Sequence, residues 1–365
     1  MRVVVAMSGG VDSSVVAGLL HEAGHEVIGV TLQLYDQGAV SGRKGACCAG
    51  QDIDDARRVA DRLGIAHYTI DAEARFAKSV IASFADGYAA GETPVPCIAC
   101  NQTVKFADLS ALARDLAAER LATGHYVRRV DGPDGPEMHR AIDPARDQSW
   151  FLFATTRSQL DRCWFPLGDM RDKRAVRDLA QRLGLRVAEK PDSQDICFVP
   201  SGAYTDVVGR LRPDALEPGE IVTEDGRVVG THEGIARYTV GQSKRLGGAV
   251  MLDGQRQVVV ATQPGPRRIV IGPQGTGVRS VRLRDVNWLM PEPPPRERLC
   301  AVKLRAREAA RSATVLTDAG ITTVTLQEPA LPAPGQACVF YDGNRVLGGG
   351  IMTRTEAGTS SQLLS

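Results

Sequence analysis

Short apolar runs alternate with amphipathic segments along residues 1–130 of the chain. The apolar runs, which are typical of strands buried on both faces of a parallel sheet, lie at 2–6, 25–34, 67–72 and 120–129. Apolar residues at helical spacing predict helices at 12–23, 52–64 and 105–120. Strands that alternate with helices predict an α/β domain with a doubly wound parallel sheet. In such a sheet, ligands bind at the carboxyl ends of the strands.

The pattern changes from about Asp206, where short β-like segments are separated by glycine-rich turns. Expected strands lie within 220–234, 238–242, 257–263, 267–272, 280–289, 301–307, 313–318, 322–326 and 336–352. Short strands with Asp-Gly turns favour small β-domains. We therefore expect a catalytic domain, a small central mostly-β domain, a C-terminal β-barrel-like domain and a polar tail, at 1–205, 206–276, 277–356 and 357–365.

The composition is that of an ordinary globular protein, with 43% hydrophobic and 24% charged residues and a formal net charge of +1. No apolar run approaches the roughly 18 residues that a membrane-spanning helix needs, so we expect a cytoplasmic protein without membrane contact. In that compartment the eight cysteines are expected to be thiols, metal ligands or catalytic groups rather than a disulfide framework.

The stretch SGGVDSS at Ser8–Ser14 follows the first predicted strand and precedes the first predicted helix. Backbone N–H groups and a helix N-terminus meet at such a turn, which makes it an anion site. Gly9 and Gly10 let the backbone approach a phosphate, and Asp12 is expected to cap the helix or to hold Mg²⁺. The alternative is a strand-to-helix turn with good capping residues. The loop lacks the lysine of a Walker A motif.

Three cysteines lie in polar or helix-terminal settings. Cys97 and Cys100 precede a helix expected to start near Asn101, where the helix N-terminus and Lys105 would stabilise a thiolate. Cys197 lies in the acid-flanked segment EKPDSQDICFVP. A metal site remains an alternative for these thiols, although zinc would require a fourth ligand.

SGGVDSS resembles the PP-loop of the N-type ATP pyrophosphatases, which cleave ATP between the α and β phosphates. Six motifs occur in the same order as in the bacterial tRNA-specific 2-thiouridylase family: SGGVDSS, PCIACNQTVKF, ATGHYVRR, RDQSWFL, PDSQDICF and YTVGQSKRLG. The segments VKLRAR and GQACVFYDG extend the resemblance almost to the C-terminus. The resemblance implies a PP-loop adenylation domain at the N-terminus.

This resemblance implies a reaction in which ATP adenylates O2 of the wobble uridine of tRNA and releases pyrophosphate. A persulfide on Cys197 then supplies the sulfur, and Cys100 acts as the second thiol and ends in a disulfide with Cys197. Because the two sulfurs must meet at bonding distance, we expect a mobile Cys197 loop. The sulfur would come from a cysteine desulfurase, directly or through a relay protein, and Mg²⁺ would accompany ATP.

The resemblance also assigns binding residues. The ATP site would comprise Ala6, Met7, Ser8, Gly9, Gly10, Val11, Asp12, Ser13, Leu32 and Gly124. The tRNA contacts would comprise Val95, Pro96, Cys97, His125, Arg146, Asp147, Gln148, Lys303, Arg305 and Gln336. We further expect Lys303, Arg305 and Arg307 to alternate along one strand and to present a basic face to RNA phosphates.

Three alternatives stay open at this point. Cys97, Cys100 and Cys197 could ligate a [4Fe–4S] cluster with one free iron, in place of the persulfide route. A different PP-loop adenylating enzyme, such as an amidating synthetase, would not need the cysteine pair. A non-catalytic iron–sulfur protein that binds RNA would use ATP only as a ligand.

Overall fold

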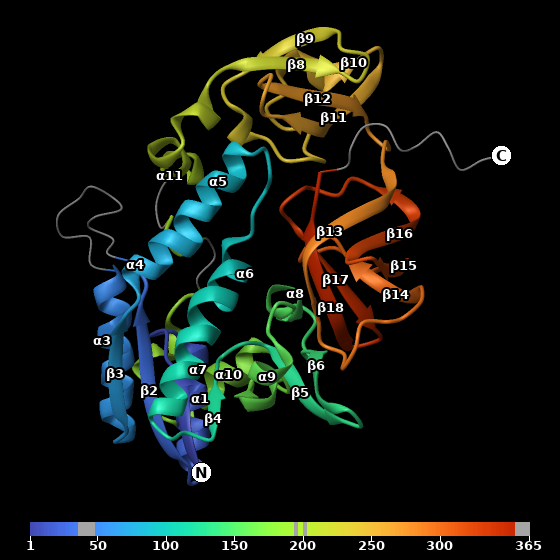
Figure 1. Cartoon of the computed structure of the whole chain (residues 1–365). Coiled ribbons are helices and arrows are strands. Elements are labelled where there is room, and N and C mark those ends of the chain that lie inside the picture. The colour runs from blue at the N-terminus through green and yellow to red at the C-terminus, as the bar shows by residue number, and fades with distance from the viewer. Residues whose placement is uncertain (36–47, 193–195, 200–202, 355–365) are drawn as a thin grey trace.

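The computed structural model describes residues 1–35, 48–192, 196–199 and 203–354, which form three β-sheets. In Figure 1 the N-terminal part is blue to green, the central part is yellow to light orange, and the C-terminal part is orange to red. The tail predicted at 357–365 lies outside the described residues. Within the described ranges, no helix is long and apolar enough to cross a membrane.

The N-terminal sheet is parallel, with the strand order β3-β2-β1-β4-β7. Its strands are β1 (Arg2–Ala6), β2 (Glu26–Gln33), β3 (Ala66–Asp71), β4 (Arg120–Ala122) and β7 (Cys163–Trp164). Val3 and Val5 join the hydrophobic cluster on one face, whereas Val4 joins the cluster on the other. A strand that is apolar at every position fits a sheet covered on both sides. The predicted doubly wound sheet is confirmed.

Helices cover both faces of this sheet. One face packs against α1 (Val11–Glu22), α3 (Cys48–Leu63) and α10 (Lys173–Arg182). The other packs against α7 (Phe106–Asp115), α8 (Ser149–Leu152) and α9 (Arg157–Arg162). The buried residues Phe106, Leu109 and Ala113 of α7 recur at helical spacing, which is why this segment forms an amphipathic helix.

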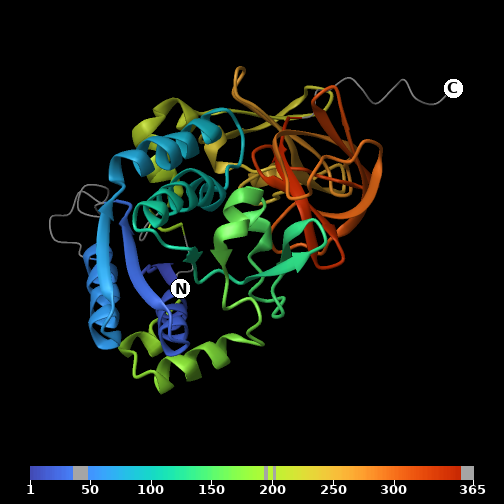
Figure 2. The ribbon, with the colours of Figure 1, turned by 60° about the horizontal axis from the view of Figure 1, so that its bottom comes forward.

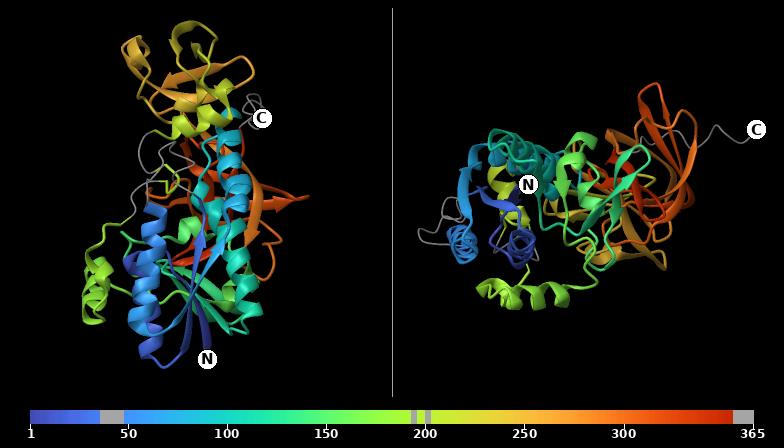
Figure 3. Two further views of the ribbon diagram at one scale, coloured as in Figure 1. Left: turned by 90° about the vertical axis from the view of Figure 1, so that its left-hand side faces the viewer. Right: turned by 90° about the horizontal axis from the view of Figure 1, so that it is seen from below.

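Two helical runs contain π-helical turns. The first consists of α4 (Glu73–Phe76), a π-helical segment (Ala77–Ala82) and α5 (Ser83–Ala89), which rises toward the central sheet (Figure 3). The second consists of α6 (Pro96–Cys100), a π-helical segment (Asn101–Lys105) and α7. The prediction that this helix starts near Asn101 is wrong, because Pro96 occupies the first helical position, which proline favours. Cys97 and Cys100 therefore lie inside the helix.

The central domain begins with α11 (Tyr204–Leu211) and contains a sheet with the order β10-β11-β12-β8-β9. These strands are β8 (Gly219–Thr223), β9 (Val228–His232), β10 (Met251–Leu252), β11 (Gln255–Gln263) and β12 (Arg268–Pro273). Short 3₁₀ turns of this domain lie at Pro213–Leu216, Ile235–Arg237 and Gly247–Val250, and another, in the first domain, lies at Arg186–Glu189. The strand expected at 238–242 is not formed. Instead, the Gln242 side chain accepts from the Thr239 N–H and donates to the Arg237 and Lys244 carbonyls, which closes a turn.

The C-terminal domain is a closed barrel of six strands, because β13 pairs with β18. The strands are β13 (Val278–Trp288), β14 (Arg298–Lys303), β15 (Arg311–Asp318), β16 (Ile321–Ala330), β17 (Ala337–Asp342) and β18 (Arg345–Met352). The barrel-like domain predicted from the sequence is thus confirmed. The predicted basic strand face is wrong, because β14 ends at Lys303 and the chain then turns. The Lys303 ammonium donates to the Ala306 carbonyl across this turn at 2.7 Å.

A hairpin connects the first domain to the barrel. It consists of β5 (Val127–Gly132) and β6 (Gly135–Arg140), and β6 pairs with β18 at His139 and Arg345. Figure 2 shows this hairpin beside the red strands of the barrel. The single strand expected at 120–129 is therefore two strands in two different sheets, separated at the turn that carries Gly124 and His125.

Candidate active site

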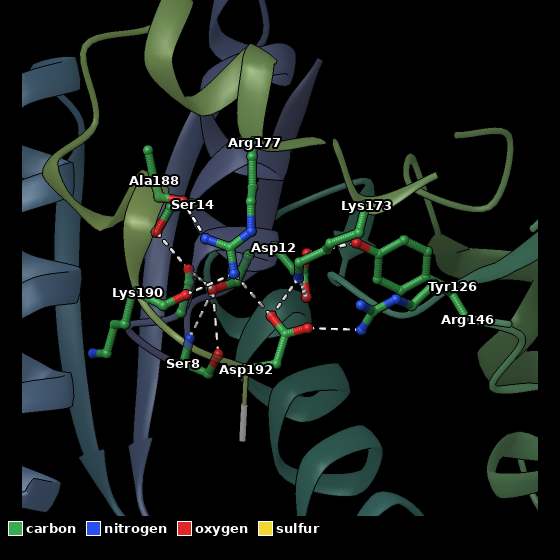
Figure 4. Close-up of polar contacts among 12 residues, drawn as sticks. Ser8, Asp12, Ser14, Tyr126, Arg146, Lys173, Arg177, Ala188, Lys190 and Asp192 are labelled. Carbon is green, nitrogen blue, oxygen red and sulfur yellow. Dashed lines mark hydrogen bonds and ion pairs between the residues drawn. The ribbon is translucent and has the colours of Figure 1, made fainter. Parts of the chain in front are cut away.

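The loop between β1 and α1 is held in shape by its own hydroxyl groups (Figure 4). The Ser8 N–H donates to Ser13 Oγ at 3.1 Å, and Ser14 Oγ donates to the Gly10 carbonyl at 2.8 Å. Gly10 is the extended N-cap residue of α1 and offers no side chain to the first-turn N–H groups. These N–H groups and the positive end of the helix dipole suit an anion such as phosphate.

The chain just after β4 lies against the first turn of α1, directly after this loop. A Cβ on Gly124 would be 2.9 Å from the Ser13 nitrogen, so glycine is required for this close approach. The Met7 N–H extends the pairing of β1 with β2 by donating to the Val30 carbonyl at 2.8 Å. Leu32, near the carboxyl end of β2, is partly buried against the neighbouring clusters. The predicted nucleotide-site residues therefore lie at the carboxyl ends of three adjacent strands.

Gly9 is the point at which the loop contacts α3. Its φ is +73°, and a Cβ there would lie 2.1 Å from the Asp52 carbonyl oxygen. We expect Gly9→Ala to lower the free energy of unfolding by about 1–3 kcal/mol through strain. Urea titration measures this loss.

Gly24→Ala is the matched control, because Gly24 has a φ of +78° and no atom within 4 Å of the added methyl group. It carries the backbone strain without the clash. Equal effects of the two substitutions would show that the contact between Gly9 and α3 does not matter for the loop.

Two lysines that are distant in sequence supply positive charge beside the loop. Lys173, at the start of α10, donates to both Asp12 carboxylate oxygens at 2.7 and 2.8 Å and pairs with Asp192 at 2.8 Å. Its side chain is only 10% exposed. Asp12 also accepts from the Tyr126 hydroxyl at 2.6 Å. Asp12 is thus held by a lysine and a tyrosine, and the prediction that it caps α1 is wrong.

Lys190 is the second of these lysines. Its ammonium donates to the Gly9 carbonyl at 2.9 Å and pairs with Asp52 and Asp55 of α3 at 2.7 and 2.6 Å. The Lys190 carbonyl in turn accepts from the Arg177 guanidinium at 2.9 Å. Lys190 is therefore bonded to the loop, to α3 and to α10.

Sequence reasoning did not identify Lys173, Lys190, Tyr126, Arg177 or Asp192 as site residues. Asp192 belongs to the quoted motif PDSQDICF, and Tyr126 belongs to ATGHYVRR. Their place in those motifs was the available signal. Lys173 carries no such signal, because 161 residues separate it from Asp12.

The three predicted site cysteines, Cys97, Cys100 and Cys197, lie at or beside a hydrophobic cluster that includes Cys100 and Phe198. Cys100 is buried, at 5% exposure, whereas Cys97 and Cys197 are exposed. Phe198 is buried in the same hydrophobic cluster as Cys100 and packs edge-on against Phe76 and Phe84, with ring centroids 5.8 and 5.3 Å apart. Phe198 therefore anchors the Cys197 segment next to α6. The mobility predicted for this segment falls partly on 193–195 and 200–202, which lie outside the described residues.

Lys105 interacts electrostatically with all three thiols. Removal from water would lower the pKa of Lys105, but its interactions with Cys100, Cys97 and Cys197 outweigh this effect and raise the pKa. Burial raises the pKa of the Cys100 thiol. Desolvation by the surrounding protein also raises the pKa of the Cys197 thiol. The charge of Lys105 opposes both shifts. The expected position of Cys100 ahead of a helix N-terminus is wrong, because the helical run begins at Pro96 and continues through Cys100.

His125 lies between the thiols and the loop. It follows Gly124, stacks on Phe106 with ring centroids 6.0 Å apart, and bonds Thr123 Oγ1 through Nδ1 at 2.9 Å. Removal from water and the charge of Lys105 lower the pKa of His125 to about 3, so the imidazole is neutral at pH 7. Gly124 therefore contacts the start of α1, and the neighbouring His125 lies within electrostatic range of Lys105.

The raised thiol pKa predicts slow alkylation of Cys197. In the folded protein at pH 8 we expect iodoacetamide to modify Cys197 at least about tenfold more slowly than in urea, where a thiol has a pKa near 8.5. The rate should rise about tenfold per pH unit above pH 8, because only the thiolate reacts. Peptide mass spectrometry gives the rate, and a plateau below pH 8 would contradict the raised pKa.

Several residues predicted to contact RNA are used within the protein. Arg146 pairs with Asp192 at 2.7 Å, Asp147 accepts from Ser149 Oγ, and Gln148 Oε1 accepts from the Tyr126 N–H. Other polar side chains of this set also bond carbonyl oxygens: Lys303 to Ala306, Arg305 to Val240 and Gln336 to Thr93. Pro96 is buried and Val95 is partly buried at the start of α6. Their contacts with RNA stay predictions.

The three thiols are not placed to hold a metal ion. Among the described residues, which include Cys97, Cys100 and Cys197, no group of three or more histidine, cysteine, aspartate or glutamate residues could hold a metal ion. We therefore derive no step through an iron–sulfur cluster.

A doubly wound sheet with this loop after its first strand, followed by a small β-domain and a β-barrel, defines a protein of the PP-loop ATP pyrophosphatase class. Sequence models of three domains match the chain in order. The tRNA methyl transferase HUP domain matches residues 1–201, the tRNA methyl transferase PRC-barrel domain matches 206–273, and the aminomethyltransferase beta-barrel domain matches 278–352.

Full-length relatives identify the family. The chain is 66% identical to the tRNA-specific 2-thiouridylase MnmA of Acidiphilium cryptum, over 96% of this chain and 100% of the relative. It is 63% identical to the protein of the same name from Gluconobacter oxydans, over 98% of this chain and 100% of that relative. The chain belongs to the tRNA-specific 2-thiouridylase MnmA family. A solved 4-thiouridine synthetase–RNA complex with bound ATP matches with a TM-score of 0.33 and 16% identity, over 58% of this chain and 50% of that chain, and adds nothing to this assignment.

Proposed function

We propose that this protein is an ATP-dependent tRNA sulfurtransferase that converts the wobble uridine into 2-thiouridine. The observation that supports it most strongly is the position of the Gly124–His125 turn. Gly124 lies against Ser13 in the first turn of α1, and His125 is close enough to Lys105 for the lysine charge to lower the histidine pKa. One uridine held at this turn would be within reach of both the nucleotide and the thiols.

The reaction proceeds in two parts. O2 of the uridine attacks the α-phosphorus of ATP and pyrophosphate leaves, which turns O2 into a good leaving group. The terminal sulfur of a Cys197 persulfide then attacks C2 and AMP leaves. Finally the Cys100 thiolate attacks the Cys197 sulfur, forms a disulfide, and leaves the transferred sulfur on C2 with the electron pair of the broken S–S bond. The two cysteines supply the two electrons that reduce this sulfur.

The residues take separate roles in this scheme. The N–H groups and hydroxyls of Ser8–Ser13 hold the phosphates, and Leu32 packs near the adenine. Lys105 favours the thiolate forms of Cys100 and Cys197, because its charge opposes the desolvation that raises the pKa of both thiols. His125 is neutral and acts as a hydrogen-bonding partner of the base rather than as a charged group. The base must leave the anticodon stack, as bases in single-stranded loops do.

The remaining assignments belong to the same proposal. The cosubstrate is Mg²⁺·ATP, and the persulfide comes from a cysteine desulfurase or a relay protein. The tRNA is contacted by Val95–Cys97, His125, Arg146–Gln148, Lys303, Arg305 and Gln336. The domain limits are 1–205, 206–276 and 277–356, and the protein acts in the cytoplasm, where its tRNA substrate is.

Mass spectrometry of the product tests this function. The protein is incubated with unmodified tRNA, Mg²⁺·ATP and a persulfide source, and the tRNA is digested to nucleosides. A uridine that has exchanged oxygen for sulfur, formed only with ATP, is expected. Pyrophosphate release without any change in nucleoside mass would contradict the proposed acceptor while leaving adenylation in place.

A further inference from the structure

The segment Gly91–Thr93, here called the junction segment, is held by both β-domains. It connects α5 to α6. From the central domain, Thr262 Oγ1 donates to the Gly91 carbonyl at 2.7 Å. From the barrel domain, the Pro334 carbonyl accepts from the Thr93 N–H at 2.7 Å, and Gln336 Nε2 donates to the Thr93 carbonyl at 2.9 Å. Both polar groups of the Thr93 backbone are thus used by the barrel domain.

Side chains of the junction segment add contacts to the same two domains. Glu92 receives two hydrogen bonds from the guanidinium of Arg284, at 2.8 and 3.3 Å, and Thr93 Oγ1 donates to Thr239 Oγ1 at 3.1 Å. Gly91 has a φ of +70°, and a Cβ there would lie 2.8 Å from Thr262 Oγ1. The three domains therefore meet at one stretch of backbone with little free space.

The junction segment leads directly into the helix that carries two thiols. Pro94 and Pro96 follow it, and α6 begins at Pro96 with Cys97 and Cys100. Each proline fixes its own φ and restricts the residue before it, so the link between Thr93 and α6 is stiff. A displacement of the two β-domains relative to the first domain would consequently move the start of α6.

We propose that the junction segment positions the thiol helix according to the placement of the two β-domains. Thr262, Gln336 and Arg284 act as positioning residues, since they fix the backbone that precedes Cys97 without approaching the reacting atoms. This inference rests on the proposed function for its catalytic consequence. The placement of the β-domains on bound tRNA would then set the position of Cys100 relative to Cys197.

Thr262 gives the sharpest test, because it is only 3% exposed and is therefore shielded from bound RNA. Thr262→Val removes the hydroxyl at nearly constant volume and leaves the Gly91 carbonyl without its donor. Thr262→Ser keeps the hydroxyl and serves as the conservative rescue. Thr231→Val is the matched control, because Thr231 is an exposed threonine on β9 of the same domain.

Hydrogen–deuterium exchange over residues 94–105 of the full chain measures how firmly the start of α6 is held. For Thr262→Val we expect roughly tenfold faster exchange there, about the effect of losing one buried hydrogen bond. We also expect a roughly tenfold lower kcat for thiolation and an unchanged Kd for tRNA. Thr262→Ser and Thr231→Val should resemble the wild type. Gln336→Glu, which removes the donor to Thr93, should accelerate exchange in the same peptide.

Unchanged exchange in residues 94–105 for both Thr262→Val and Gln336→Glu would overturn the proposal. Faster exchange with a normal kcat, or with a Kd for tRNA that rises as much as kcat falls, would overturn it too. If the wild type forms no 2-thiouridine, the proposed function fails, and the exchange measurement still decides whether the junction segment holds α6.

Discussion

Replacing Cys197 with serine is expected to abolish 2-thiouridine formation and to leave pyrophosphate release nearly intact. A serine hydroxyl cannot carry a persulfide, so sulfur transfer should fall by at least about 10³-fold, the scale seen when a nucleophile is removed. Adenylation should survive, because the SGGVDSS stretch is bonded by Lys190 and Lys173 rather than by the thiol. Parallel assays of pyrophosphate and of digested nucleosides separate the two steps.

Cys100→Ser should give a different pattern from Cys197→Ser. Without the second thiol, sulfur would remain bonded to Cys197 and to the base, and a covalent protein–RNA adduct should accumulate. Cys163→Ser is the control, because Cys163 is a buried thiol on β7 that takes no part in the proposed reaction. Thiolation at the wild-type rate by Cys197→Ser would refute the persulfide route.

The first sheet and its loop could be predicted because their signals are local. The short apolar run at 2–6 favours a strand covered on both faces, and the glycines and serines after it favour a tight turn into a helix. The barrel strands were found in the same way from their short length and Asp-Gly turns.

The start of α6 and the hairpin could not be predicted from local patterns. A helix that opens at Pro96 and passes through a π-helical segment lacks a regular apolar period. The hairpin at 127–140 is stabilised by pairing with β18, which lies more than 200 residues further along the chain. Contacts of this kind depend on how whole domains meet, and no short window of sequence reports them.

The charges around the loop were missed for a related reason. Lys173 resembles any surface lysine in the sequence, whereas Lys190 lies in the quoted segment EKPDSQDICFVP; only the fold brings the two to Asp12 and Gly9. The absent Walker lysine thus did not mean that the loop lacks nearby positive charge. Conversely, Gln336 and Arg305 were expected to contact RNA, and the structure shows both donating to carbonyls between domains.

Lys173→Met is expected to have the second large effect, on stability and on adenylation together. The lysine is nearly buried between two carboxylates, and removing one member of such a buried ion pair costs about 3–5 kcal/mol. The lower end applies here, because Asp192 keeps Arg146 at 2.7 Å and Asp12 keeps the Tyr126 hydroxyl. Urea titration should therefore show a loss of about 3 kcal/mol.

The same substitution should change the pH dependence of stability. Burial alone would raise the pKa of Asp192, but Lys173 and Arg146 outweigh this effect and lower it. A lowered carboxyl pKa stabilises the fold above the ordinary aspartate pKa, and this stabilisation is lost as the pH falls through the lower folded value. In Lys173→Met the pKa of Asp192 should rise toward its ordinary value, so stability should depend less on pH in that acidic range.

Adenylation should fail for a geometric reason in this variant. Asp12 would no longer be held beside the loop, and a misplacement of about 1 Å in such a site costs about 10²-fold in rate. Lys244→Met, at an exposed lysine of the central domain, controls for the loss of one positive charge. Pyrophosphate release within about twofold of the wild type would show that Lys173 stabilises the fold without positioning Asp12. Lost release at unchanged stability would instead place the Lys173 ammonium on the nucleotide itself, with Asp12 and Asp192 as the carboxylates that hold it there before ATP binds.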